Sequence, residues 1–556
     1  MHGIGWCCFA ASLLFTSCVE AAQTTYEVDS VEALTNVLTQ MKTGKYYPNT
    51  LIKLKPKVYD LTGVYMSAES HLEVKLDAWG TWFLGQGAKP GDVVLKGDGT
   101  HRVLYFGYGS DSYLNVISNL TITGGYTTGS GGGVWQKAFY PSLFVYDSIV
   151  SNNVSTAKGQ YDGGGGIYCG SAIRTLFVDN KSANAGGAIH CGGSGKSTKL
   201  NANPYVKECV FVNNQQTDTY GKDYGGGAVS CGSCYDSWFT NNVGKTGGAV
   251  GVSVYSNPAT ISNCVFSGNS ASSGGGALYK PAAVVDCEFD GNKASGSAED
   301  GQIYTASRMS VNHCSFTGAC AGNYGAIAHD LNLVDCTIVG CTVTRPRAIW
   351  NCNLVRCRVA GNTVDSDNNG YDFDIWTEGA ACTNVNCVFS LNHVTTYGAI
   401  CKGKTLINCT IVSNQVEKSN YARVIDNCPM FNTVLQGNRI GESYYDIRTK
   451  PSLKVYQPPV CTNCVFTAAD VAADAEGMFE CRKVKSVRFV NCDWAGGIVD
   501  VKRNANLLGR AFAPDWLLSV VGDTDVNGNP RICRDALDIG AVEYQYPNIG
   551  LMLLFR

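Results

Sequence analysis

The sequence predicts an all-β protein, a parallel β-helix solenoid that begins with a short capping helix. Three observations lead to this prediction. Glycine and cysteine are frequent, with 64 and 26 copies in 556 residues, whereas proline has only 15. Two short motifs alternate along the chain, and a repeat period of roughly 20–50 residues indicates a solenoid. The apolar residues form short β-branched or aromatic runs without helical spacing, so the repeats contain strands.

The first motif has the form F-x-x-N, in which an aliphatic residue can replace the Phe. In several places neighbouring copies are about 22 or 23 residues apart, the length of one solenoid turn. The copies are IVSN 149–152, FVDN 177–180, FVNN 211–214, FTNN 239–242, FSGN 266–269, FDGN 289–292, VAGN 359–362, FSLN 389–392, IVSN 411–414 and LQGN 435–438, with FTGA 316–319 and IVGC 338–341 as degenerate copies.

The second motif is Gly-Gly-Ala followed by an aliphatic residue. We expect its glycines to form a corner open to positive φ and its alanine to admit a close backbone approach. The copies are 164–167, 186–189, 226–229, 247–250, 275–278, 325–327 and 398–400.

Stacked turns explain why these residue types recur. Equivalent residues of successive turns lie about 4.8 Å apart, so each Phe can stack on the next inside a narrow core. The Asn is expected at the turn that ends the strand, because Asn tolerates the left-handed region and bonds nearby backbone. Stacked Asn side chains can also bond one another along the axis.

The ends of the chain differ from the repeats and define the predicted domains. Residues 1–22 read as a signal peptide with an apolar segment at 9–17, cleaved after Ala21 or, alternatively, lipidated at Cys18. Residues 23–100 are predicted to form the N-terminal cap and first coils, 101–500 the repeats and 501–556 a C-terminal cap segment.

Within the N-terminal cap, residues 30–41 predict an amphipathic helix with Ser30 as N-cap, and 51–61 predict a strand of alternating polarity. Residues 521–545, which contain DIGAVE, resemble the closing segment of many secreted bacterial β-helix proteins, and we expect them to cover the last coil.

Cysteine recurs two residues before the strand Phe, which places it on the same side of the strand as the Phe and therefore inside. Buried thiols, disulfides and metal ligands are three interpretations of this row, and buried thiols are the first choice. The row is Cys209, Cys264, Cys287, Cys314, Cys336, Cys357, Cys387, Cys409 and Cys464. A second row, Cys169, Cys191, Cys231 and Cys401, follows the Gly-Gly-Ala motif.

The alternation of Gly-Gly-Ala-(Ile/Leu/Val) with F-x-x-N resembles the repeats of the polymorphic outer membrane proteins over about residues 120 to 440. The resemblance implies a right-handed parallel β-helix at the surface of a Gram-negative bacterium. Autotransporter members of that family end in a transmembrane barrel of on the order of 250 residues. Only 56 residues follow position 500 here, so self-translocation is not implied.

The sequence predicts no catalytic residues. Asp-Asp pairs and Gly-His-Gly, expected of a polygalacturonase-type hydrolase, do not occur. A lyase would need a basic residue near a carboxylate. The weak candidates for that role are Arg345 and Arg347 with Asp365, Asp367, Asp372 and Asp374, which are more simply a degenerate corner and a polar loop.

Histidines and acidic residues of the repeats give no further site. His190, His313 and His329 lie inside repeat units and are interpreted as structural. Asp523, Asp525, Asn527 and Gly528 have the spacing that opens a calcium loop, but the twelfth position is Arg534, so an Asn-Gly turn is the simpler interpretation. No metal site and no cofactor are predicted.

The predicted function is therefore binding or adhesion, or an envelope role, by an exported, surface-exposed monomer without an integral membrane segment. An extracellular glycan or a cell-surface ligand is the expected partner, and the 29 tyrosines could stack on sugars. The near balance of 43 Lys+Arg against 46 Asp+Glu excludes nucleic-acid binding driven by bulk charge. The alternative is a polysaccharide lyase or glycoside hydrolase, and a purely structural envelope component is a third possibility.

Overall fold

A computed structural model describes residues 24–543 apart from 26 gaps. The chain divides into two compact units, residues 1–282 (unit 1) and 283–556 (unit 2). Residues 1–22, including Cys18, lie outside the described part. The gaps are 44–49, 75–79, 108–113, 138–141, 160–161, 192–203, 218–224, 231, 253–257, 296–300, 306–307, 321–326, 344–346, 365–373, 378–381, 396–397, 418–422, 427, 445–459, 468–477, 488, 494–497, 502–506, 508–510, 512 and 534–535.

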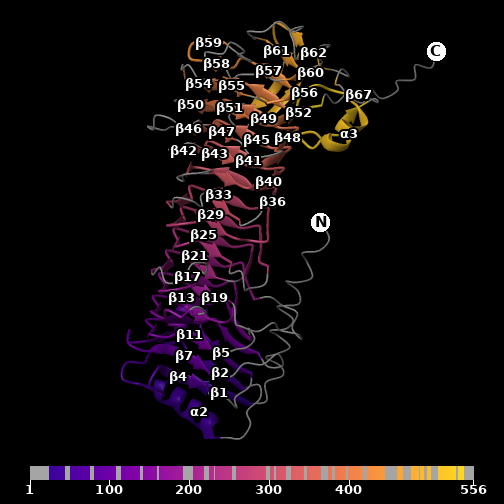
Figure 1. The fold of residues 1–556 in the computed structure, drawn as a ribbon. Coiled ribbons are helices and arrows are strands. Elements are labelled where there is room, and N and C mark those ends of the chain that lie inside the picture. The colour runs from indigo at the N-terminus through magenta and orange to yellow at the C-terminus, as the bar shows by residue number, and fades with distance from the viewer. Residues whose placement is uncertain are drawn as a thin grey trace, which may run out of the picture. The chain divides into compact units, whose positions relative to one another are not determined.

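Unit 1 consists of short strands that pair in parallel with the equivalent strand of the next coil (Figure 1). Its first sheet contains β1 (Thr24–Val28), β2 (Thr50–Leu54), β5 (Thr81–Gly85), β8 (Asn115–Ser118), β12 (Leu143–Tyr146), β16 (Ser171–Ile173), β20 (Tyr205–Lys207), β24 (Ser233–Tyr235) and β28 (Thr260–Ser262). Its second sheet contains β3 (Lys57–Asp60), β6 (Val93–Lys96), β9 (Thr121–Thr123), β13 (Ile149–Ser151), β17 (Leu176–Val178), β21 (Val210–Val212), β25 (Trp238–Thr240) and β29 (Val265–Ser267).

Two further sheets complete the coils of unit 1. The third contains β4 (Ser70–Val74), β7 (Arg102–Phe106), β11 (Val134–Gln136), β15 (Ile167–Tyr168), β19 (Ile189–His190), β23 (Val229–Ser230), β27 (Val250–Gly251) and β31 (Leu278–Tyr279). The fourth contains β10 (Tyr126–Thr127), β14 (Val154–Ser155), β18 (Lys181–Ser182), β22 (Gln215–Gln216), β26 (Val243–Gly244) and β30 (Ser270–Ala271).

Unit 2 repeats this arrangement. Its first sheet contains β32 (Ala283–Val285), β36 (Met309–Asn312), β40 (Leu331–Val334), β44 (Asn353–Val355), β48 (Thr383–Val385), β52 (Thr405–Ile407), β56 (Met430–Phe431), β60 (Cys461–Thr462) and β62 (Met478–Phe479). Its second sheet contains β33 (Glu288–Asp290), β37 (Ser315–Thr317), β41 (Thr337–Val339), β45 (Arg358–Ala360), β49 (Val388–Ser390), β53 (Thr410–Val412), β57 (Val434–Gln436), β61 (Val465–Phe466) and β63 (Arg482–Lys483).

The remaining strands of unit 2 form smaller sheets. Those after the glycine motif are β35 (Ile303–Tyr304), β39 (Ala328–His329), β43 (Arg347–Trp350), β47 (Asp374–Thr377), β51 (Ala399–Lys402) and β55 (Arg423–Asp426). Those after the Asn motif are β34 (Lys293–Ala294), β38 (Ala319–Cys320), β42 (Thr342–Val343), β46 (Thr363–Val364), β50 (His393–Val394), β54 (Gln415–Val416), β58 (Arg439–Ile440) and β59 (Ser443–Tyr444). The predicted parallel β-helix is thus confirmed, and parallel crossovers are right-handed in almost all proteins.

The phenylalanines of F-x-x-N stack inside the coils, as predicted. In unit 1 the rings of Phe177, Phe211 and Phe239 follow one another at centroid separations of 4.8 Å and interplanar angles of 7° and 2°. In unit 2 Phe289 and Phe316 stack at 5.0 Å. The spacing equals the distance between paired strands, so the register of the sheet sets the register of the core.

The asparagines of the same motif form a buried hydrogen-bonded column. Asn242 Nδ2 donates to Asn269 Oδ1 of the next coil (3.0 Å) and to the carbonyl oxygen of Phe211 (3.0 Å). The backbone N–H of Asn242 also donates to Asn269 Oδ1 (2.9 Å). The same contacts recur at Asn153, Asn180 and Asn214 in unit 1 and at Asn362, Asn392 and Asn414 in unit 2.

Two details of the Asn prediction are wrong. The left-handed residue is the one before the Asn, such as Asp179 at φ 56° or Asn213 at φ 54°, because the Asn itself has to point inward. The first copy is also one residue out of register: Val150 is the core residue and Asn153, not Asn152, is the column member.

The glycine motif is explained mainly by close approach. A Cβ on Gly227 would lie 2.2 Å from the carbonyl oxygen of Gly248 in the next coil, and one on Gly187 would lie 2.1 Å from that of Gly227. Positive φ occurs at some copies, for example Gly186 at 62°, but Gly227 and Gly248 do not have it. The second glycine is therefore required because no side chain fits between the stacked backbones.

The cysteine row is buried, as predicted, and the described cysteines are free thiols. Cys209 Sγ donates to the carbonyl oxygen of Lys207 (3.2 Å), and the N–H of Cys209 donates to Ser237 Oγ in the next coil (3.0 Å). In unit 2 the N–H of Cys357 donates to Cys387 Sγ (3.5 Å). The row is thus a hydrogen-bonding column that Ser and Thr also occupy, at Ser148, Thr175, Ser237 and Thr433.

The second cysteine row is also buried where it is described. Cys169, Cys191 and Cys401 are fully buried free thiols, and Cys231 lies outside the described residues. Burial raises the pKa of Cys169 and of Cys209 to about 12, which keeps these thiols protonated.

At the N-terminal end the predicted helix is confirmed as α2 (Val31–Thr43), which contacts β1 and β4. The N–H of Ala33 donates to Ser30 Oγ (3.0 Å), so Ser30 is the N-cap. The predicted strand 51–61 is two strands, β2 and β3. No helix of the described residues is both long and apolar enough to cross a membrane.

The described residues of the closing segment pack along the flank of unit 2. It includes α3 (Asp515–Val521), β66 (Ile532–Cys533) and β67 (Ala536–Leu537), and Figure 1 shows α3 and β67 beside β48, β52 and β56. Asn386 Nδ2 donates to the carbonyl oxygen of Val521 (2.6 Å), and Ala541 N–H donates to Thr410 Oγ1 (2.9 Å). An antiparallel pair, β64 (Phe489–Asp493) and β65 (Ile498–Val501), precedes it.

The closing segment encloses a fully buried arginine with three buried carboxyl groups. Arg531 lies 3.9 Å from Glu543 Oε2, and Asp525 Oδ2 accepts the backbone N–H of Glu543 (2.9 Å). Burial raises the pKa of Glu543 to about 8, although Arg531 opposes the shift and Asp538 adds to it.

The Asn column should carry a large share of the stability. Asn242→Ala removes four hydrogen bonds and leaves buried polar groups unsatisfied, so we expect a loss of about 3 kcal/mol. Thr240→Ala on the same coil is the control and should change stability by less than about 0.5 kcal/mol. Urea midpoints measure both, and equal shifts would contradict the structural role of the column.

Steric exclusion at the glycine motif is tested by Gly227→Ala. The new Cβ would lie 2.2 Å from a backbone oxygen, so the coils have to separate, and we expect a clear fall in the melting temperature. Gly91→Ala meets nothing within 4 Å and should be neutral or stabilising by about 0.5 kcal/mol. A tolerated Gly227→Ala would show that the stacked backbones are not in contact.

The Glu543 carboxyl predicts a pH dependence of stability. Between its ordinary pKa of 4.5 and the folded value of about 8, the folded state holds a proton that the unfolded state has lost. Stability is therefore highest below that window and falls as pH rises through it. Glu543→Gln should remove on the order of 3 kcal/mol of this fall, measured by urea unfolding at several pH values. Identical pH profiles for variant and wild type would refute the assignment.

Candidate functional site

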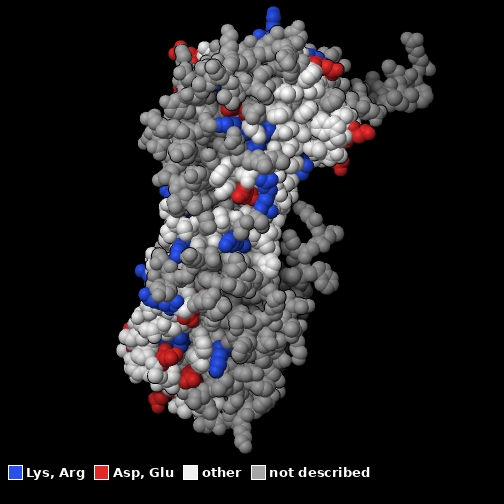
Figure 2. All heavy atoms as spheres, in the orientation of Figure 1, with Lys and Arg blue, Asp and Glu red and all other residues white. Residues whose placement is uncertain are grey.

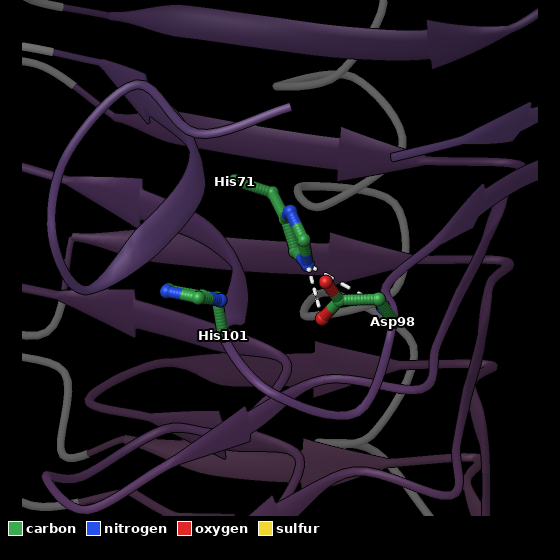
Figure 3. A group of neighbouring side chains, drawn as sticks. All are labelled: His71, Asp98 and His101. Atoms are coloured by element: carbon green, nitrogen blue, oxygen red, sulfur yellow. Dashed lines mark hydrogen bonds and ion pairs between the residues drawn. The ribbon is translucent and has the colours of Figure 1, made fainter. Parts of the chain in front are cut away.

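In the described part of the chain, one group of histidine and carboxylate side chains converges closely enough to hold a cation. It consists of His71, Asp98 and His101, whose ligand atoms all lie within 4.8 Å of one another (Figure 3). His71 lies on β4, Asp98 in the turn after β6, and His101 directly before β7. Since β4 and β7 pair in parallel, successive coils bring the two histidines together.

The position of His71 fixes its tautomer. Its ring Nδ1 lies 2.7 Å from the carbonyl oxygen of Val64, which can only accept, so Nδ1 carries a proton. Nε2 faces Asp98 Oδ1 at 3.1 Å and accepts the backbone N–H of Asp98 at 3.4 Å. The His71 side chain is fully buried and cannot turn away.

Asp98 is held as a carboxylate by several donors. Its Oδ1 accepts the backbone N–H (2.9 Å) and the hydroxyl (2.6 Å) of Thr100, and its Oδ2 accepts the Tyr65 hydroxyl (2.8 Å). Burial alone would raise the pKa of Asp98, but the bonds from Thr100 and Tyr65 and the nearby His71 ring hold it well below its usual range. The site therefore has a permanent negative charge.

Two aromatic contacts complete the site. The ring of Tyr65 lies 4.3 Å from that of His101 and stacks on that of His71 at 5.3 Å. His101 Nδ1 lies 2.8 Å from Thr100 Oγ1. The hydrogen bond to Asp98 raises the pKa of Tyr65, so its hydroxyl is a poor base near neutral pH. The arrangement is better suited to holding a cation than to removing a proton.

Sequence reasoning missed this site. Tyr65, His71, Asp98 and His101 form no local motif, and they lie before the recognisable repeats. The only usable signal is that His71 and His101 lie near the starts of paired strands on adjacent coils, and that pairing is not visible until the coil length there is known.

The predicted lyase candidates are only partly described. Arg345, Asp365, Asp367 and Asp372 lie outside the described residues, together with Arg534 of the calcium motif. Arg347 and Asp374 are paired in register on β43 and β47.

The three repeat histidines occupy separate structural positions, in agreement with their interpretation. His190 stacks on Tyr168 at 5.2 Å, and burial lowers its pKa to about 4. His313 lies on a corner between Asp286 (3.4 Å) and Asp335 (3.5 Å). His329 stacks on the Trp350 ring at 4.6 Å.

The calcium-like motif is a turn. Asp525 is fully buried, and its Oδ1 accepts the backbone N–H groups of Asn527 and Asn529, each at 2.8 Å. Gly528 has φ 80°, as an Asn-Gly turn requires. The carboxylate is thus used by the backbone of its own loop.

Aromatic side chains form a column on the outer face of the third sheet of unit 1. Tyr105, Trp135, Tyr168 and His190 follow one another with interplanar angles of 22°, 18° and 12°. Their faces are therefore covered by one another. These tyrosines stabilise coil stacking and do not offer the free ring faces that sugar stacking needs.

A second outward column is apolar. The residue before each core Phe of unit 1 is aliphatic or aromatic, and the members are paired in register across the second sheet. We call Ile149, Leu176, Val210, Trp238 and Val265 the apolar column. Its largest member, Trp238, is 50% exposed.

In the later coils of unit 2 the apolar residues at the same repeat position are covered, whereas Glu288, Ser315, Thr337 and Arg358 in the earlier coils are exposed or half-buried. Val388, Val434 and Val465 are at most 1% exposed, because the closing segment packs on them. The covering residues include Val526, Ile539, Ala541 and Val542.

Comparison with known proteins gives one family. Residues 174–192 and 263–280 match the Chlamydia polymorphic membrane protein repeat. Both segments run from the corner before a core Phe to the residues after Gly-Gly-Ala. No curated protein matches the chain.

Several solved structures resemble the chain at low TM-scores. An alginate lyase from Paenibacillus sp. str. FPU-7 is 13% identical (65% of this chain, 100% of that chain, TM-score 0.21). Tailspike protein 3 of bacteriophage CBA120 is 11% identical (81% and 62%, TM-score 0.27). PfbA, a surface adhesin of Streptococcus pneumoniae, is 9% identical (72% and 89%, TM-score 0.22). Likenesses of this size do not bear on what this chain does.

The assignment rests instead on the repeats, because the two matched segments coincide with the stacked F-x-x-N and Gly-Gly-Ala units. This chain is a parallel β-helix protein that contains, at residues 174–192 and 263–280, repeats of the Chlamydia polymorphic membrane protein type.

Proposed function

We propose that this chain is a surface-exposed adhesin-type protein that binds a protein ligand along the apolar column of unit 1. The observation that carries the proposal is the contrast between the two units. In unit 2 the chain's own closing segment buries Val388, Val434 and Val465 at this repeat position, whereas in unit 1 the apolar column is partly exposed and includes the half-exposed Trp238. A partly exposed run of apolar side chains in register is typical of an interaction surface.

The chemistry of the column favours a polypeptide over a glycan. Its members are mostly aliphatic, and such side chains bury well against other aliphatic side chains but offer no hydrogen bonds to hydroxyl groups. The closing segment shows which kind of partner fits on this repeat position, since it contributes Val526, Ile539 and Val542. Tryptophan is also among the residues that contribute most to protein interfaces.

The charges of the described coils support binding rather than catalysis. Arg174 and Asp147 form a two-bond pair (2.6 and 2.9 Å) between adjacent coils, and Arg356 and Asp335 form another (2.7 and 2.8 Å). Figure 2 shows both positively and negatively charged side chains on the described part of the face in view. Within each pair the two opposite charges neutralise each other, and the two pairs do not form a common charged site.

Surface exposure is part of the same proposal. It is supported by the membrane-protein family of the repeats and by the apolar segment 9–17, which reads as a signal sequence for export. Ordinary cleavage after Ala21, origin in a Gram-negative bacterium and a monomeric state belong to the proposal as well.

A polysaccharide lyase is the second candidate, because Arg347 and Asp374 are paired in register on adjacent coils. Incubation with a panel of acidic polysaccharides separates the two functions. We expect no rise in the ultraviolet absorbance of unsaturated sugars above a buffer control. Product formation that Arg347→Gln abolishes would replace the binding proposal by the lyase.

The binding proposal predicts an effect of Trp238→Ser. Screened against extracellular proteins and a glycan array, the immobilised chain should bind a protein ligand saturably, and the variant should bind it roughly 30-fold more weakly. Thr240→Ser, on the same strand and face, is the matched control and should bind like the wild type. Binding confined to glycans, or a ligand indifferent to Trp238→Ser, would contradict the proposed face.

A further inference from the structure

We propose that His71, Asp98 and His101 bind a divalent transition-metal ion of the zinc type in the first coils of unit 1. This site is independent of the apolar column and of the proposed ligand. None of its residues lies in a segment that matches the repeat family.

The first argument is a pair of lone pairs that face each other. His71 Nδ1 has to donate to the carbonyl oxygen of Val64, so a neutral ring has no proton on Nε2. Asp98 Oδ1, the atom 3.1 Å from Nε2, belongs to a carboxylate and also only accepts. A metal ion between the two atoms would use both lone pairs, and on Nε2 it would take the place of the backbone N–H of Asp98 that the ring accepts at 3.4 Å.

The second argument is distance. Metal bonds of about 2.0–2.1 Å in a tetrahedral site place the ligand atoms about 3.3 Å apart. The 3.1 Å separation of His71 Nε2 and Asp98 Oδ1 already has this value. The His101 ring nitrogen lies within 4.8 Å of both, so a small rotation of a partly exposed side chain completes three ligands. Figure 3 shows the His101 ring beside the pair.

The third argument is the outer shell. Metal-binding histidines usually donate their other N–H to a carbonyl oxygen, as His71 does to Val64, and metal-binding carboxylates are themselves hydrogen-bonded. Asp98 has the Thr100 N–H and the Tyr65 hydroxyl in these roles. A buried histidine oriented in this way is preorganised to coordinate.

The ligand types select the metal class. Two imidazoles and one carboxylate suit Zn²⁺ and related ions, whereas Ca²⁺ and Mg²⁺ prefer all-oxygen sites. Three protein ligands leave a fourth position for a water molecule or another small ligand. Binding would also connect the turn after β6 to β4 and β7.

The test uses the full chain, freed of metal by a chelator and kept reduced, with Co²⁺ as a spectroscopic substitute for Zn²⁺. We expect one equivalent to bind with visible bands typical of nitrogen and oxygen ligands. Binding by the numerous thiols is recognised separately, because it produces a sulfur-to-cobalt charge-transfer band in the near ultraviolet. Zn²⁺ should displace the Co²⁺ and raise the melting temperature.

Three variants make the test specific. His101→Asn removes a partly exposed ligand and should weaken Co²⁺ binding by at least about 100-fold, and Tyr65→Phe, which removes an outer-shell hydroxyl, by roughly 10-fold. His313→Asn is the control, because that histidine also lies between two carboxylates, at 3.4 and 3.5 Å, and should leave binding unchanged. Circular dichroism verifies that each variant is folded.

Two results would overturn the proposal. One is a wild-type chain that binds no Co²⁺ or Zn²⁺ outside the thiol band. The other is binding that His101→Asn and Tyr65→Phe leave unchanged, which would place the ion elsewhere.

Discussion

The structure depends on one interaction: the inward Asn side chain of a coil is hydrogen-bonded to the equivalent Asn of the next coil. In the Asn column, each side-chain amide joins its own coil to both neighbours. Because the bonds run between identical positions, the column works only while successive coils stay in register. The stacked phenylalanines and the Ser, Thr and Cys row use the same register.

The outward residues take no part in these inward hydrogen bonds, so their side chains can vary and can contact a ligand. Outward residues also form columns, but their chemistry differs from place to place. The aromatic column of Tyr105, Trp135 and Tyr168 covers its own ring faces. The apolar column of unit 1 retains a half-exposed Trp238, while the closing segment buries Val388, Val434 and Val465 in unit 2.

The His71, Asp98 and His101 cluster shows how a solenoid builds a polar site. Each coil contributes one or two side chains, and parallel pairing of β4 with β7 brings them within bonding distance. The turn around Asp98 adds backbone and hydroxyl donors that keep the carboxylate charged. A site of this kind needs no local motif, only side chains that the pairing of successive coils brings close together.

The sequence by itself determined the parallel β-helix, the inward Phe and Cys positions and the Ser30 N-cap, because a repeated pattern reports which residues face the core. It did not determine which residue of each corner is left-handed, nor that the second glycine is excluded by a carbonyl oxygen of the next coil, because both depend on the exact coil register. Only the tertiary structure placed the closing segment on the flank of unit 2 and His71 beside Asp98. Those contacts join residues with no shared periodicity, and the distance between them is set by coil lengths that the sequence pattern does not reveal.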